Sequence, residues 1–405
     1  MRVITTIDTI LSKMPDLNKA RRKFIGHCLL MFLRIGVRIN FLSLARHSAN
    51  YVESSYRNHF EDYFDFSTFN TELVLGTGSG HYVIGLDMTY IRKSGKETQG
   101  VGKYWSGCSG KAEWGLEAGI LAAIDVDHHS AFHIDAVQSP DKAERTAAGF
   151  SYMDHCVCLV VWNQRNLKRL SDYLVVDAYF TKKEFIHPVV EKTGLGVIGR
   201  LRNDADLRYL YEGVQKSGKG RPKQYDGKVN WQSPQMQRFR LVYKGEDLSI
   251  YEAKLYCIFL RRCLKIAYVR FHHKTGKQAY KIYFSTDLHL PAWQITRYYQ
   301  ARFQEEFLIR DAKQFTGLQH CQARSRAKTE FHWNMSLTTV NLAKVEHWIK
   351  IPKEERKSFS MKDVKIRYYN ELLLDTFFDN LPNGDELKKN NPQMKQLYSF
   401  GARDA

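Results

Sequence analysis

Two short apolar runs, each ending in an aspartate, constrain the fold of this chain most strongly. Residues 82–86 lead into Asp87, and residues 173–176 lead into Asp177. Runs of this length and composition are typical of buried strands, and the C-terminal ends of such strands carry the functional groups of open α/β sheets. Taken singly, each aspartate is more simply interpreted as a turn or helix N-cap residue. Two such runs together predict an α/β sheet with a pair of acids at one edge.

The chemistry of an acid pair limits the kind of ligand that such a site can bind. Two carboxylates held close together disfavour joint ionisation unless a cation compensates them. Hard oxygen ligands without cysteine or histidine beside them suit Mg²⁺ or Mn²⁺. The pair Asp87 and Asp177 therefore predicts a divalent-metal site.

A third acid lies on a predicted helix over residues 292–315. At about 100° per residue, Tyr299, Arg302, Glu306 and Lys313 fall within a stripe roughly 60° wide. One interpretation is a solvated charged face with an Arg302–Glu306 ion pair at i, i+4. The other is a functional face, on which the glutamate binds metal and its three neighbours contact phosphates. Helix geometry alone leaves the two open.

The charge of the chain favours a polyanionic partner. It has 61 Lys and Arg against 43 Asp and Glu, a formal net charge of +18. Such charge can simply serve solubility, but basic side chains that neutralise phosphates release counterions and so bind nucleic acid. A membrane surface is disfavoured by the even spread of charge. Neither a run of about 20 apolar residues nor a signal peptide is evident, and the seven cysteines are scattered, so we expect a cytoplasmic protein.

The pattern along the chain divides it into successive regions. Residues 1–75 are expected to be helical, as a helix-turn-helix DNA-binding domain or an ordinary three-helix bundle. A glycine-rich linker follows at residues 76–80. The remaining predicted regions are 80–202, the first part of a catalytic domain; 203–286, a β-rich insertion; 287–349, the second part of the catalytic domain; and 350–405, a C-terminal helical region.

The spacing Tyr299-x2-Arg302-x3-Glu306-x6-Lys313 resembles the Y-R-E-K signature of the insertion-sequence-four family of bacterial DDE transposases. The stretches around both aspartates, 85–89 and 176–180, are similar to that family too. So are residues 220–225 and 331–337. The resemblance covers residues 80–345 and is thin outside them.

This resemblance implies a ribonuclease-H-like fold, a mixed sheet flanked by helices and interrupted by a β insertion. The family's catalytic acids carry over to Asp87, Asp177 and Glu306, which would hold two Mg²⁺ or Mn²⁺ ions. The implied activity is cut-and-paste DNA transposition, by phosphodiester hydrolysis and strand transfer. The implied partners are double-stranded DNA, as inverted repeats and target, and a second copy of the chain. The implied location is the bacterial cytoplasm.

Further DNA contacts are expected around these acids. Besides Tyr299, Arg302 and Lys313, we expect contacts from Arg200, Arg202 and Arg310, with plain surface charge as the alternative for the first two. The family flips a base onto an aromatic side chain, for which Trp231 and Trp293 are candidates, although a structural role is the more ordinary interpretation of each. Glu305 faces about 100° away from Glu306, so Glu306 is the expected ligand.

Two other functions remain open. One is a related nuclease or a transposase relative that binds DNA without cutting it. The other is a DNA-binding regulator that uses its N-terminal helices. Only the catalytic interpretation requires Asp87, Asp177 and Glu306 to converge on a pair of ions about 3.5–4 Å apart.

Overall fold

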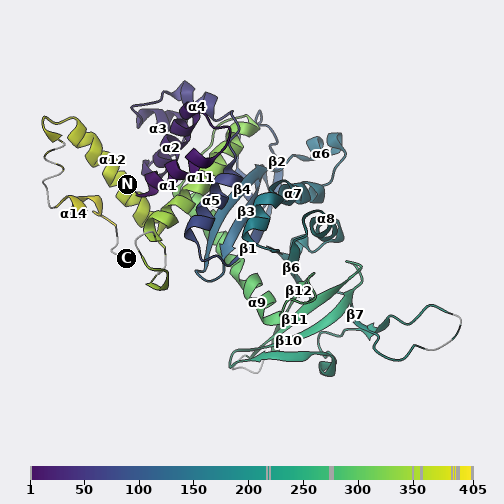
Figure 1. The fold of residues 1–405 in the computed structure, drawn as a ribbon. Helices are drawn as coiled ribbons and strands as arrows, with labels where there is room; N and C mark the ends of the chain where they lie inside the picture. The colour runs from purple at the N-terminus through teal and green to yellow at the C-terminus, as the bar shows by residue number, and fades with distance from the viewer. Residues whose placement is uncertain are drawn as a thin grey trace.

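One continuous mixed sheet organises the protein (Figure 1). The computed structural model describes residues 2–402, apart from 216–217, 219, 273–277, 349–350, 356–358, 385, 387 and 389–392. The strand order is β2-β3-β1-β5-β6-β12-β11-β10-β7-β8, with β4 paired to β3 and β9 paired to β10. The strands are β1 (Tyr82–Arg92), β2 (Gly102–Ser106), β3 (Lys111–Asp125), β4 (Ser130–Gln138), β5 (Tyr173–Val176), β6 (Gly196–Leu201), β7 (Leu207–Leu210), β8 (Tyr225–Lys228), β9 (Arg240–Lys244), β10 (Leu248–Cys257), β11 (Arg262–His272) and β12 (Gln278–Ser285).

The centre of the sheet is parallel and its two wings are antiparallel. Strands β1, β5 and β6 run parallel, while β3 pairs antiparallel with β1 and β4. On the other side, β12 pairs antiparallel with β6, Ile282 opposite Leu201. The strands of the predicted insertion, residues 203–286, are therefore a continuation of the central sheet. They extend away from the helices at the lower right of Figure 1.

Helices cover both faces of the central strands. The helices after the N-terminal part are α6 (Lys142–Ala148), α7 (Tyr152–Leu170), α8 (Lys183–Thr193), α9 (Ala292–Ala301), α10 (Phe303–Phe315), α11 (Arg326–Trp348), α12 (Met361–Asp379) and α14 (Met394–Tyr398), with short 3₁₀ turns at Ala178–Phe180, Met236–Arg238 and Lys353–Glu355. Alternate β1 residues enter different cores, because strand side chains alternate between faces: Val83 packs in the cluster containing α9, α10 and α11, and Ile84 in the cluster containing α7 and α8. The expected α/β sheet flanked by helices is confirmed.

The N-terminal helices do not form a separate core. They are α1 (Arg2–Lys13), α2 (Lys19–Arg34), α3 (Phe41–Arg46), α4 (Glu53–His59) and α5 (Phe66–Thr77). Phe24 of α2 and Phe60 share one buried cluster with Trp333 of α11, and Phe60 packs on Phe331 with ring centroids 4.4 Å apart. Helix α5 runs through Gly76 into the predicted linker. The region predicted as a helical DNA-binding domain is thus packed on the sheet-bearing remainder of the chain.

Helix α11 is buried along most of its length, and its polar side chains are matched to β4. Asn341 donates its amide to the His133 carbonyl (2.8 Å) and accepts the His133 N–H (2.8 Å). Asn334 donates to the Ala136 carbonyl (2.8 Å). Buried polar groups are stabilising only when hydrogen bonded, so these bonds fix α11 in register beneath the sheet.

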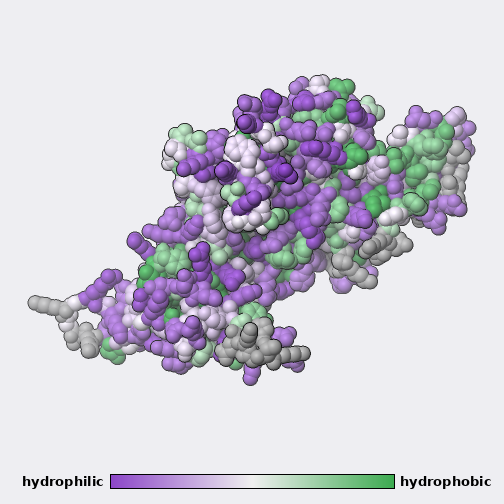
Figure 2. All heavy atoms as spheres, turned by 180° about the vertical axis from the view of Figure 1, so that it is seen from behind, coloured by the Kyte–Doolittle hydropathy of each residue, from purple (hydrophilic) through white to green (hydrophobic). Residues whose placement is uncertain are grey.

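The C-terminal helix α12 packs on α2 through a buried lysine. Lys365 donates to the carbonyls of Phe32 (2.7 Å) and Ile35 (2.6 Å) at the end of α2, where helix carbonyls lack intrahelical partners. The outer side of this region is apolar, with Leu373 and Phe377 exposed. Figure 2, viewed from behind, shows hydrophobic surface gathered over it against a largely hydrophilic molecule.

Lys365 should make stability depend on pH. Burial lowers the pKa of Lys365 from 10.5 to about 7, so the folded state favours the neutral amine. The contribution of Lys365 to the free energy of unfolding is therefore fully present above the unfolded-state pKa and is lost as the pH falls toward 7. We expect the free energy of unfolding of wild type, relative to Lys365→Met, to rise by about 1.4 kcal/mol per pH unit between pH 7 and 9. Urea unfolding at three pH values measures this. Lys362→Met, exposed on the same helix, is the control, and equal slopes for wild type and Lys365→Met would contradict the prediction.

Candidate active site

Asp87 and Asp177 lie side by side on parallel strands. Strands β1 and β5 pair in register up to the residue before each aspartate, and adjacent strands are about 4.8 Å apart. Val83 and Val175, at even spacing from the aspartates, both belong to the core beneath α9, α10 and α11. Because side chains two residues apart share a face, both carboxylates point toward these helices. The two aspartates therefore lie on neighbouring parallel strands, and their role as metal ligands stays a prediction.

The position of Asp87 within its strand differs from expectation. Asp177 directly follows β5 and caps the next turn, its Oδ1 accepting the Tyr179 N–H (2.8 Å). Asp87, in contrast, lies in the middle of β1, which continues to Arg92 opposite Gly115 of β3. The prediction that Asp87 ends a strand is wrong, because the long strand β3 supplies pairing partners beyond the point where β5 stops.

Asp87 is electrostatically coupled to the other predicted acids. Burial raises its pKa to about 6, the Arg302 guanidinium and a hydrogen bond from the Met88 N–H oppose that rise, and the charges of Asp177 and Glu306 add to it. Like charges act on a pKa in this way only at short range. The structure thus brings the three predicted carboxylates into one electrostatic neighbourhood.

Glu306 lies at the open side of this neighbourhood. It is in the first turn of α10, its side chain is 42% exposed, and its Oε1 accepts from Arg302 Nη2 (2.9 Å). Arg302 occupies the junction between α9 and α10, which divides the predicted helix, although its backbone remains helical. The Arg302 guanidinium therefore lies between Glu306 and Asp87. Burial alone would lower the pKa of Arg302, but the surrounding acids outweigh this effect and the pKa is raised.

The remaining members of the predicted stripe are anchored to the sheet. Tyr299 stacks on Tyr283 of β12, with ring centroids 4.5 Å apart. Lys313 donates to Thr89 Oγ1 (2.7 Å) and to the Tyr90 carbonyl (3.1 Å). Thr89 is two residues beyond Asp87, on the same face of β1. In this structure Tyr299 and Lys313 thus fasten the helices over the acids, and burial lowers the pKa of Lys313.

Glu305 is a fourth acid, which helical periodicity did not predict as a ligand because it faces away from Glu306. Its side chain is completely buried, and neither carboxylate oxygen has a hydrogen-bond partner among the described residues. Burial raises its pKa well above the usual value, the Asp87 charge adds to this, and the nearby Arg302 guanidinium only partly opposes it. The sequence contains a signal that Glu305 is buried. Glu305 lies on the apolar face of α10, where Leu308 and Ala312 follow at i+3 and i+7.

The chemistry of this donor set fits a divalent cation. Among the described residues, no group of three or more His, Cys, Asp or Glu side chains is arranged so that it could hold an ion. Nevertheless, the site gathers carboxylates that burial and mutual repulsion disfavour as anions, and Glu305 has unpartnered buried oxygens. Buried charges are normally paired or bound to metal, and oxygen donors of this kind suit Mg²⁺ or Mn²⁺. Ligation by Glu306 would require it to release Arg302.

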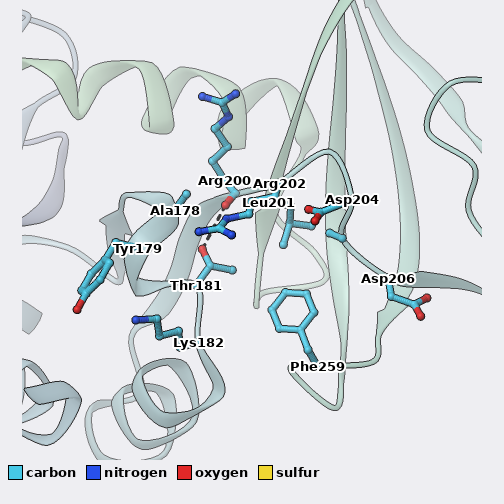
Figure 3. A pocket seen from close by; sticks show the side chains of 11 residues that line it. Ala178, Tyr179, Thr181, Lys182, Arg200, Leu201, Arg202, Asp204, Asp206 and Phe259 are labelled. Atoms are coloured by element: carbon cyan, nitrogen blue, oxygen red, sulfur yellow. Dashed lines mark hydrogen bonds between the residues drawn. The ribbon is translucent and has the colours of Figure 1, made fainter. Parts of the chain in front are cut away.

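A cavity of about 450 Å³, lined by both basic and acidic side chains, opens directly beyond Asp177 (Figure 3). Tyr179 and Lys182 line one side, with the ammonium 3.8 Å from the ring centroid. Arg202, directly after β6, extends its guanidinium toward Ala178 and Thr181, whereas the Arg200 side chain points away from Phe259 and out of the cavity. Thr181 fastens this corner by donating to the Arg200 carbonyl (3.2 Å). Of the two predicted arginines, Arg202 thus enters the cavity, whose lining also includes Asp204 and Asp206.

The other predicted contacts are placed elsewhere. Trp231 is 4% exposed, donates its indole N–H to the Ala205 carbonyl (3.2 Å) and packs on Tyr268, as a core residue does. Arg310 is exposed on α10, its guanidinium 4.6 Å from the Phe307 ring centroid. The structure does not bring Trp231 to the acids. Trp293 of α9 is 46% exposed.

Comparison with known families bears on these residues. Residues 160–342 match the family described as the transposase DDE domain. The matched stretch contains Asp177, the insertion strands and the helix with Glu306, whereas Asp87 lies outside it. A search of curated proteins gives no match. Within the described part of the chain, membrane-spanning helices are not found.

Proposed function

We propose that this chain is a DDE transposase with a ribonuclease-H-like catalytic domain, of the insertion-sequence-four type. Its acids would be Asp87, Asp177 and Glu306, and its reaction cut-and-paste DNA transposition. The similarity of residues 160–342 to the transposase DDE domain supports the class. The Y-x2-R-x3-E-x6-K spacing supports the type.

The observation that carries the proposal is the register between β1 and β5. It sets Asp87 beside Asp177, on the face of the sheet over which α10 holds Glu306. Metal-dependent phosphodiester chemistry requires acids from segments far apart in sequence, and the electrostatic coupling of Asp87 to Asp177 and Glu306 supports this role; a DNA-binding regulator has no need of such acids.

The acids would hold two Mg²⁺ or Mn²⁺ ions, which activate a water or 3′-hydroxyl nucleophile and stabilise the leaving oxygen. The chain's own side chains position the strand. Arg302 can turn from Glu306 to a phosphate, and Lys313 and Tyr299 can contact the backbone nearby. Arg310, exposed on α10, could contact more distant phosphates.

The cavity beyond Asp177 would carry the DNA strand away from the acids. Arg202 and Lys182 supply positive charge there, beside Asp204 and Asp206, and the exposed ring of Tyr179 offers a stacking surface of the kind that single-stranded nucleic acid uses. The proposed substrate is double-stranded DNA, as the inverted repeats of the element and its target. The proposed assembly is a homodimer that pairs two ends, in the bacterial cytoplasm.

The proposal is tested with a duplex built from the inverted repeat expected beside the gene. We expect wild type to cleave this duplex in Mg²⁺ and to stop when the ion is chelated. Glu306→Gln should cleave at least about a hundredfold more slowly, since single preorganised electrostatic groups contribute 10²–10³ in rate. Single-turnover gel assays measure both rates.

The matched control is Glu246→Gln, at an exposed glutamate in the insertion, which should cleave like wild type. Equal cleavage by wild type and Glu306→Gln would refute the assignment of Glu306. Tight binding of the duplex without cleavage under any divalent ion would favour the regulator or an inactive relative.

The cations of the cavity predict a change in salt dependence. Arg202→Ala should weaken DNA binding and reduce the slope of log K against log[salt] by about one, because one phosphate contact is lost. Fluorescence anisotropy at several NaCl concentrations measures the slope. Arg165→Ala, exposed on α7, is the control; an unchanged slope for Arg202→Ala would show that the cavity does not hold the backbone.

A further inference from the structure

Glu305 is a buried acid without a role in the reaction outlined above. We propose that it is an additional metal ligand, which joins Asp87 on the side of the site nearest to β1. This inference rests on the proposed function, because it assumes that the acids bind divalent ions. It assigns two neighbouring glutamates of α10 to one metal centre, Glu306 from the open side and Glu305 from the buried side.

The position of Glu305 is determined by a glycine of β1. A Cβ atom at Gly85 would lie 2.4 Å from Glu305 Oε2, so the carboxylate occupies the space that any side chain at residue 85 would fill. Gly85 is two residues before Asp87 and therefore on the same face of the strand. The Glu305 carboxylate consequently rests on β1 immediately beside the base of Asp87.

The Glu305 carboxylate receives no hydrogen bond from the part of the chain that the structure describes. Both oxygens are buried and unpartnered among the described residues. The guanidinium nearest in sequence, that of Arg302, donates to Glu306 (2.9 Å). A buried polar group without a partner is destabilising by about 1–3 kcal/mol, and more if it is charged. A cation bound between Glu305 and Asp87 would remove this penalty.

The residues around Glu305 show that packing alone does not require an acid at this position. Leu308 and Ala312 of α10 are buried and apolar, as is Ala301 at the end of α9. An apolar residue at 305 would fill the space without an unpartnered group. The acid is therefore better explained by a ligand than by the core, and its completely buried side chain supplies a preorganised donor that solvent does not reach.

Binding of Mn²⁺ alone tests the inference, with the full chain and isothermal titration calorimetry. We expect Glu305→Gln to weaken Mn²⁺ binding at least tenfold, since even groups behind a ligand cost 10–100-fold when replaced. Without metal, the same variant should unfold at the same temperature as wild type or higher, because a neutral amide replaces a destabilised carboxyl group. Glu246→Gln should match wild type in both measurements.

The outcomes separate this inference from the proposed function. If Glu306→Gln weakens Mn²⁺ binding and Glu305→Gln does not, Glu305 is not a ligand and the proposed function stands. If wild type binds Mn²⁺ no better than Asp87→Asn, the metal centre itself is refuted. Should Glu305→Gln fail to fold, Glu305→Met decides, since its flexible apolar side chain fills the same space: wild-type affinity for Mn²⁺ would overturn the inference.

Discussion

Asp177→Asn should reduce Mg²⁺-dependent cleavage of the end duplex roughly a thousandfold or more, the upper part of the range for a single electrostatic group, while binding of that duplex is retained. The reason is that the substitution removes charge and little else. Asp177 caps its turn through Oδ1, which accepts the Tyr179 N–H, and an asparagine oxygen can accept the same bond. The backbone between β5 and the cavity should therefore keep its shape.

Single-turnover cleavage and anisotropy measure the two quantities on the same protein. Asp172→Asn is the matched control, because Asp172 precedes the same strand and is 75% exposed in an ion pair with Lys168. It should cleave within about twofold of wild type, as exposed ion pairs contribute little. Cleavage by Asp177→Asn within threefold of wild type would remove Asp177 from the reaction.

The sequence was sufficient for the features that depend on local pattern. Apolar runs predicted β1 and β5, and the register shows that these strands are neighbours, which is the condition under which the two aspartates were expected to lie together. Helical periodicity placed Glu306 together with Arg302 on one face, and the structure joins them in an ion pair. Both results follow because strand and helix periods are properties of the backbone.

The features that the sequence did not predict depend on long-range pairing and on burial. Asp87 lies within its strand because β3 continues beside it, which local pattern cannot reveal. Trp231 is enclosed by Tyr268 and Phe239 because the insertion strands join the central sheet and build a core. Glu305 was set aside for facing away from Glu306, yet its face of α10 is the one that packs against β1.

Gly85→Val should destabilise the protein and disable the site together. Any Cβ at residue 85 meets Glu305 Oε2 at 2.4 Å and Ile124 Cδ1 at 2.9 Å, and valine adds two methyl groups to a space already closed. Overpacking of this kind costs about 1–3 kcal/mol. We expect that loss in urea unfolding, together with loss of cleavage, because the displaced Glu305 carboxylate has Asp87 beside it.

A second substitution separates overpacking from a general strand defect. Glu305→Ala removes the atoms that valine would strike, so the double variant should be more stable than the sum of the two single effects by about 0.5–3 kcal/mol, the range for residues in contact. Gly107→Val, at an exposed turn with no atoms within 4 Å of its Cβ position, should change stability by about 0.5 kcal/mol or less. Strict additivity between residues 85 and 305 would mean that valine is accommodated without moving Glu305, and that Gly85 is not what holds the fourth carboxylate against the acid pair.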